Sequence, residues 1–382
     1  MRGLVDGLAS VLLPVHLAAL GHGPFEIGAL VTATLLGSAA LTLAVGLFGG
    51  RLRARAVLFA ACGLMAFTGL GFGLLDAFAP LLVVAFVGTL NPSGGDVSVF
   101  LPTEQALLAE ASAPEDRTAL FARYNLAGGF AAALGALASG LPGRAAEALG
   151  ADPLAMQRLA FAAYALAAAL LLWLYRPLRE RVPEPPPAPR APLARSRRTV
   201  LALAALFSLD SFGGGFVVQS LLAVWLFARF GFSVEAVGAV FFAANALAAL
   251  SQLASPALAA RIGLVRTMVF THVPANAFLV LAAFMPTAAS AVACLLLRMA
   301  FSQMDVPARQ SLVMALVPAE ERAAAASVTN VPRSLATALA PGLAGALLAA
   351  SSFGWPLVVG GGLKLVYDAA LFAAFRARDP SR

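Results

Sequence analysis

A small set of ionisable residues interrupts the long apolar stretches of this sequence. A carboxylate or guanidinium among apolar neighbours is costly to bury unless it binds a proton, a substrate ion or an opposite charge. These residues are therefore the candidates for binding and proton-coupling chemistry. They are Asp6, Asp96, Glu104, Asp210, Arg298, Asp305 and Arg309.

The elements that position them are expected to be membrane-spanning helices. Of the 382 residues, 60% are hydrophobic and 12% are charged, whereas a soluble domain is typically about 45–50% apolar and about 25% charged. Twelve apolar blocks are each long enough to cross roughly 30 Å of hydrocarbon. They are 3–20, 26–48, 56–75, 79–110, 118–141, 158–175, 199–228, 235–260, 264–285, 288–316, 324–350 and 356–375.

The arginines predict the orientation of these spans. Seventeen arginines fall in the loops and tails on one side, and only Arg144, Arg158 and Arg229 fall on the other. Loops rich in Arg and Lys stay in the cytoplasm. We therefore expect both termini to be cytoplasmic, in a cell inner membrane, and we do not interpret the net charge of +7 as nucleic-acid binding.

The sequence divides into two related halves. The Pro- and Arg-rich segment 176–198 is expected to be a cytoplasmic linker between an N-terminal six-helix bundle (1–175) and a C-terminal one (199–382). "GHGPFEIG" at 21–28 matches "GFSVEAVG" at 231–238, and "PTEQALLAEASAPEDR" at 102–117 matches "PARQSLVMALVPAEER" at 307–322. Ordered matches at nearly constant offset indicate a duplication.

Six plus six spans, a basic central linker and the loop "APEDR" (113–117) resemble the major facilitator superfamily. The resemblance covers essentially the whole chain and implies an all-α polytopic membrane protein. Its twelve transmembrane helices would form two pseudo-symmetric six-helix bundles around a central cavity. The loop motif between spans two and three is altered, with Gly50 in place of an aspartate and Arg53 in place of a glycine.

The resemblance also implies that spans 1, 4, 7 and 10 line the cavity, and that spans 3, 6, 9 and 12 face lipid. Asp6, Asp96, Asp210, Arg298 and Asp305 all lie on the lining set. We take them as the candidate substrate or proton-coupling residues. The candidate polar residues of the cavity are Asn91, Asn125, Gln219, Asn245 and Asn330. For the last four, helix–helix hydrogen bonding is the leading interpretation and contact with substrate is the alternative.

Span four contains a predicted break. "NPSGGD", Asn91 to Asp96, places a proline and two glycines close to the middle of a run of about 30 residues, or roughly 45 Å of helix. Irregular backbone at this depth is tolerated only against water or protein. Asp96 would then be a proton carrier or a counter-charge, whereas the alternative is a kink with Asp96 fixed by an arginine.

The other charges have alternatives of their own. Asp6 would couple protons or cations, or brace the helix; Asp210 would act at a hinge beside "SFGGG" (211–215). For Asp305, a static pair with Arg298, seven residues away, is expected, and Arg298 could instead hold an anion. In span twelve, Lys364 and Asp368 lie four residues apart, so they are expected to form an ion pair across one helical turn.

The repeat predicts a gate. Glu104 and Arg309 occupy equivalent positions at the offset of 205 and have opposite charges. They could meet between the halves and close the cytoplasmic side. The alternative pairs Glu104 with Arg123, and Arg309 with Asp305, each within its own half.

The chain contains no nucleotide-binding, nucleophile or metal-ligand motif, so we expect no enzymatic activity, no cofactor and no bound metal. The leading hypothesis is a secondary active transporter working by alternating access, a proton-coupled exporter of small amphipathic or cationic compounds. The alternatives are an importer or facilitator of a small organic anion, a small-ion (metal) exporter, and a transporter-like scaffold without transport. The expected partners are the substrate, protons and the lipid bilayer, with no nucleic acid, and the protein is expected to be a monomer.

Overall fold

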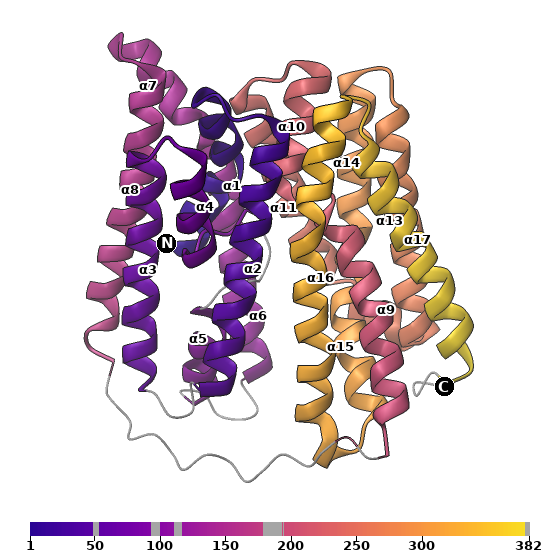
Figure 1. The fold of residues 1–382 in the computed structure, drawn as a ribbon. Coiled ribbons are helices and arrows are strands. Elements are labelled where there is room, and N and C mark those ends of the chain that lie inside the picture. The colour runs from indigo at the N-terminus through magenta and orange to yellow at the C-terminus, as the bar shows by residue number, and fades with distance from the viewer. Residues whose placement is uncertain (49–52, 93–99, 111–116, 179–192, 194, 379–382) are drawn as a thin grey trace.

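The computed structural model describes residues 1–48, 53–92, 100–110, 117–178, 193 and 195–378. The described residues form helices joined by short loops, and no strand occurs among them. Helices that precede the linker lie on one side of the molecule, and helices that follow it lie on the other (Figure 1). We refer to these as the first and second halves, and to the end of the molecule near the linker as the linker side.

Helices of the first half match the six predicted blocks closely. They are α1 (Arg2–Ala19), α2 (Pro24–Phe48), α3 (Ala54–Leu74), α4 (Phe78–Val87), α5 (Phe100–Glu110), α6 (Arg117–Leu137), the 3₁₀ turn η2 (Ala138–Gly140), α7 (Leu141–Leu149) and α8 (Pro153–Tyr175).

The second half repeats this pattern. It contains α9 (Arg197–Gly215), α10 (Gln219–Phe230), α11 (Val234–Gln252), α12 (Ser255–Ile262), α13 (Leu264–Phe284), α14 (Ala288–Ser302), α15 (Asp305–Leu316), the turn η3 (Ala319–Glu321), α16 (Arg322–Ala350), α17 (Trp355–Phe375) and the turn η4 (Arg376–Arg378). Over the described residues, 11 helical segments are long and apolar enough to cross a membrane. The shorter apolar helix α4 and helix α5 together occupy the fourth predicted block.

Several helix starts have local causes that can be read from the sequence. Asp152 accepts hydrogen bonds from Leu154 N at 3.3 Å and Ala155 N at 3.1 Å, which caps α8. Ser233 caps α11 through Ala236 N at 3.2 Å. These side chains satisfy amides that have no partner in the first turn of a helix.

Helix breaks occur in three of the spans that were expected to line a cavity. Helix α4 ends at Val87, where Gly88 takes an extended conformation, and α5 begins at Phe100, which confirms the predicted interruption of span four. Span seven is divided between α9 and α10, and span ten between α14 and α15. The break in span seven follows three consecutive glycines, with which α9 ends.

The two halves touch where small residues allow close backbone approach. A Cβ added to Gly28 on α2 would lie 2.5 Å from Pro341 O and 2.8 Å from Gly345 Cα, both on α16. A Cβ on Gly238 of α11 would lie 2.4 Å from Ala136 O on α6. Each of these contacts lies near the helix ends opposite the linker side (Figure 1). That end of the structure is therefore held closed by direct helix packing.

We expect Gly28→Ala to destabilise the protein, because the new methyl group must push α2 away from α16. Overpacking of this kind costs about 1–3 kcal/mol, so thermal unfolding in detergent should shift to lower temperature. Gly128→Ala on α6 is the matched control, since nothing lies within 4 Å of its added Cβ. Equal unfolding temperatures for the two variants would contradict a stabilising contact between α2 and α16.

Candidate functional site

Asp6 lies near the start of α1, which begins about halfway up the bundle (Figure 1). Its side chain accepts a hydrogen bond from the Tyr164 hydroxyl of α8 at 3.0 Å, and the residue is only 8% exposed. Among the described residues, no cationic side chain lies within ion-pair distance of this carboxyl group. Asp6 is thus a buried carboxyl group with a neutral partner.

Glu104 on α5 has a very different environment. Arg2 lies 3.0 Å away as an ion pair, and the hydroxyl groups of Tyr124 and Tyr175 both donate to the carboxylate. Arg123, the local partner expected from the sequence, is exposed, and the structure places Arg2 there instead. Spacing along the sequence could not predict this partner of Glu104, because Arg2 lies on α1 and Glu104 lies on α5.

Asp210 is the centre of a buried ionic cluster in the second half. The Lys364 ammonium lies 2.6 Å from one carboxylate oxygen, and the Arg309 guanidinium lies 3.4 Å from the other. His272 Nε2 is 3.7 Å from the first oxygen. These groups come from α9, α17, α15 and α13, so the cluster connects four helices of one half.

Lys364 and Asp368 do not pair with each other as the sequence suggested. Lys364 binds Asp210, while Asp368 lies 2.8 Å from His272 Nδ1 and accepts from Asn276 at 3.0 Å. The prediction failed because α17 was expected to face lipid, whereas Asp368 is fully buried. The side chains point to separate partners on neighbouring helices.

Asp305 and Arg298 do not pair either. Asp305 lies 3.5 Å from Arg309 on the same helix, which is the local pair that the sequence offered as the alternative for Arg309. The break after Ser302 separates Arg298 on α14 from Asp305 on α15 and removes the register that a continuous helix would give. Arg298 Nη1 lies 3.1 Å from Met299 Sδ, and its Nε is buried without a hydrogen-bond partner.

The predicted cavity amides have different environments. Asn91 and Gln219 are buried, and Gln219 Nε2 has no hydrogen-bond partner within the described structure. Asn245 is partly buried, whereas Asn125 and Asn330 are exposed. Asp96 lies outside the described residues.

Ser220 is a residue that the sequence argument missed. It is fully buried at the start of α10, and its Oγ lies 2.8 Å from Ser10 O and 2.9 Å from Pro92 O. Its backbone amide also donates to Pro92 O at 3.2 Å. The interrupted backbone of span four is therefore bound by the other half, at the break of span seven. The glycines before this break were the only signal of it in the sequence.

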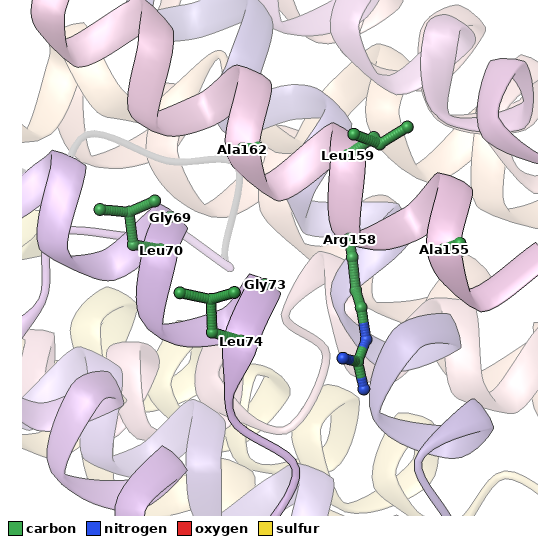
Figure 2. A pocket seen from close by; sticks show the side chains of 8 residues that line it. All are labelled: Gly69, Leu70, Gly73, Leu74, Ala155, Arg158, Leu159 and Ala162. Carbon is green, nitrogen blue, oxygen red and sulfur yellow. The ribbon is translucent and has the colours of Figure 1, made fainter.

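A groove on the outer surface lies between α3 and α8 and does not belong to this interior site. Figure 2 shows its lining, which is apolar apart from Arg158, and its volume is about 400 Å³. Leu74 and Leu159 are 71% and 58% exposed, as expected for side chains that face lipid. Arg158 pairs with Asp76 at 2.7 Å.

The described residues thus combine membrane-spanning helices, helix breaks and buried charges. Residues 1–341 match the family model described as Major Facilitator Superfamily. The chain belongs to the Major Facilitator Superfamily. The resemblance drawn from the sequence is confirmed, and so is the expectation that the protein is a transporter and not an enzyme.

A curated relative and several solved structures are similar to this chain over nearly its whole length. The chain is 26% identical over 418 residues to the uncharacterized membrane protein YJR124C of Saccharomyces cerevisiae, covering 99% of this chain and 92% of that protein. The nucleoside transporter NupG has a TM-score of 0.74 at 15% identity, covering 98% of this chain and 96% of that one.

Two further solved structures share the fold. The D-xylose-proton symporter has a TM-score of 0.71 at 16% identity, with 98% and 95% of the two chains covered. A bacterial homologue of the iron transporter ferroportin, solved in an inward-facing state, has a TM-score of 0.70 at 17% identity, with 97% and 96% covered. Such likenesses establish the twelve-helix fold of the superfamily for this chain.

Glu104 and Arg309 each have partners in their own half in this structure: Arg2 for the former, Asp210 and Asp305 for the latter. The gate between the halves remains a prediction for the conformation that is closed on the linker side. Glu104 and Arg309 could exchange their present partners for each other at a small net free-energy cost, because desolvation nearly offsets the attraction within buried ion pairs. Alternating access requires some contact that forms on one side while the other side opens.

We predict that Glu104→Arg and Arg309→Glu each impair transport, and that the double swap restores a substantial part of the flux. The reason is that opposite charges would again meet across the linker side. Proteoliposome flux is the measurement, and Arg123→Glu is a control for surface charge alone. A double swap no better than the worse single variant would exclude the gate and leave the local pairs as the full account.

Proposed function

We propose that this superfamily member is a proton-coupled secondary transporter that exports small amphipathic or cationic compounds, with Asp6 as the proton-binding group. The observation that supports this proposal is the environment of Asp6. Its carboxyl group is buried and is bound by one neutral hydroxyl, whereas Glu104 and Asp210 are each bound by cations. Asp6 can thus gain or lose a proton without breaking an ion pair.

The same carboxyl group suggests how exchange would occur. A carboxylate with a single neutral donor can bind either a proton or a cationic group, and the two compete for it. When the site opens to the outside, a proton can displace the bound cation, which then leaves. When the site opens to the inside, the proton can leave and a new cation can bind. The orientation proposed here has the linker and both termini on the cytoplasmic side of an inner membrane, as the arginine asymmetry favours.

We predict that Asp6→Asn abolishes proton-driven export while leaving expression and monodispersity near wild type, because asparagine keeps the shape and loses the charge. Lipophilic cations such as ethidium and tetraphenylphosphonium are first compared for their effect on the unfolding temperature of the wild-type protein. The cation that raises it most is used as the transport probe. Its export from proteoliposomes is then followed with an imposed pH gradient.

Asp76→Asn is the control for this experiment, since Asp76 is an exposed carboxyl group in a surface ion pair. It should transport like wild type. Undiminished pH-driven export by Asp6→Asn would contradict the coupling role of Asp6.

Transport of a small organic anion is the second candidate, and a separate observation favours it. The Arg298 Nε is buried without a hydrogen-bond partner, and no carboxylate lies within ion-pair distance of this guanidinium among the described residues. The Gln219 amide nitrogen is likewise buried without a partner. Unpaired buried donors are costly, and an anionic substrate would satisfy them.

We expect Arg298→Ala to leave cation export nearly unchanged if the leading proposal holds. If the substrate is an anion, the same variant should abolish the thermal shift caused by an aromatic carboxylate such as benzoate. Arg298→Lys would then restore little of it, because a lysine cannot form the paired hydrogen bonds of a guanidinium. A thermal-shift panel of cations and carboxylates therefore decides between the two candidates.

A further inference from the structure

His272 is a buried imidazole that the proposed coupling through Asp6 does not involve. It lies on α13 between two carboxylates, with Nδ1 2.8 Å from Asp368 Oδ1 on α17 and Nε2 3.7 Å from Asp210 Oδ1 on α9. The side chains of the three residues are at most 6% exposed. Both ring nitrogens thus face carboxylate oxygens in a site nearly closed to solvent.

This geometry favours a protonated ring. A neutral imidazole has one donor nitrogen and one acceptor nitrogen, while an imidazolium has two donors. An ionised carboxylate only accepts, so a neutral ring between Asp368 and Asp210 would place a lone pair against an anion. The Asn276 amide nitrogen donates to the other Asp368 oxygen at 3.0 Å and lies 3.1 Å from Nδ1, and the shorter contact of Nδ1 is with Asp368 Oδ1 at 2.8 Å.

The contacts of Asp368 lead to the same conclusion. Lys364 and Arg309 contact Asp210, and Arg309 also contacts Asp305. Among the described residues, the Asp368 carboxylate has only His272 and Asn276 as polar partners, and neither is a permanent cation. With a neutral ring, Asp368 would be a buried carboxylate without a cationic partner, which is costly. A proton on His272 supplies that partner.

Apart from the two carboxylates, no permanently charged group among the described residues contacts the ring directly. The Tyr367 ring stands perpendicular to the imidazole with its centre 5.8 Å away. Lys364 and Arg309 both lie on Asp210 and not on the ring. Arg333 of α16 donates to Ser211 at 2.8 Å and contacts neither carboxylate that faces His272.

We propose that His272 is a second proton-binding site, separate from Asp6, whose proton joins the cavity-lining helix α9 to the outer helices α13 and α17. Loss of the proton leaves Asp368 without a cationic partner and weakens the connections of α13 to α9 and α17, while the Lys364–Asp210 pair between α17 and α9 remains. The protonation state of His272 therefore influences how α9 moves within its own half. This inference does not depend on the substrate or on coupling through Asp6.

His16 supplies an internal comparison. It is also buried, with Nε2 2.8 Å from Phe72 O and Nδ1 3.2 Å from Gln157 Oε1. A glutamine amide can turn so that its nitrogen donates to the ring, which lets a neutral imidazole satisfy both sides. A carboxylate has no such alternative, so the two buried histidines should differ in charge.

The chain has 3 histidines, so imidazole nitrogen NMR can resolve them. We expect one imidazolium signal near neutral pH that disappears in His272→Gln and persists in His16→Gln. In Asp368→Asn the same signal should change to that of a neutral ring, because Nδ1 then no longer contacts a buried carboxylate. A neutral His272 signal in the wild-type protein would overturn the proposal.

Stability supplies the second arm of the test. His272→Gln should lower the unfolding temperature, and the double variant His272→Gln/Asp368→Asn should recover at least half of the loss, since it removes the carboxylate that the first substitution leaves without a cation. Asp6→Asn combined with His272→Gln should not show this recovery. If the Asp368 substitution worsens the loss, His272 is only a packing residue. Both arms use purified protein without substrate, so their outcome is independent of transport assays.

Discussion

The cost of placing charge inside an apolar helix bundle governs the arrangement of this protein. Even on a lenient scale a charge at the centre of a bilayer costs about 2.5–3.5 kcal/mol, and breaking a buried ion pair costs about 3–5 kcal/mol. Glu104 and Asp210 accordingly have cationic partners at 3.0 Å and 2.6 Å. Against that background Asp6 and Arg298 are exceptions, and a mobile ligand can bind them without first separating an established pair.

Unsatisfied backbone groups impose the second constraint, and it connects the helix breaks to the contact between the halves. A broken helix frees carbonyl groups that lipid cannot bind. Pro92 O is satisfied by Ser220 from the other half, and the same Oγ reaches Ser10 O on α1. The breaks in spans four and seven therefore stabilise each other. A change of conformation that separates the halves at this point must supply water or substrate to the freed carbonyl groups.

The sequence predicted the spans and the break in span four because both depend on local properties, namely the length of apolar runs and the low helix propensity of Pro and Gly. The partners of the buried charges depend instead on how each helix is rotated about its axis. Lys364 and Asp368 have the spacing of a helical pair, yet each binds a residue about a hundred or more positions away along the chain. Tyr164, which binds Asp6 at 3.0 Å, was missed for the same reason. Tertiary packing sets these choices, and a single sequence without relatives does not reveal them.

The two halves share the order of their helices and breaks but differ in how their buried charges are paired. Among the described interior residues of the first half, Glu104 pairs with Arg2, whereas Asp6 is bound by a hydroxyl group. In the second half, the described buried carboxylates are Asp210, Asp305, Glu321 and Asp368, and two guanidinium groups, those of Arg298 and Arg333, have no carboxylate partner among the described residues. A ligand that reached both halves would therefore meet a carboxyl group without a cation in the first half and guanidinium groups without a carboxylate in the second. Because these groups are fixed on helices that move with their own half, separation of the halves would change the distance between them.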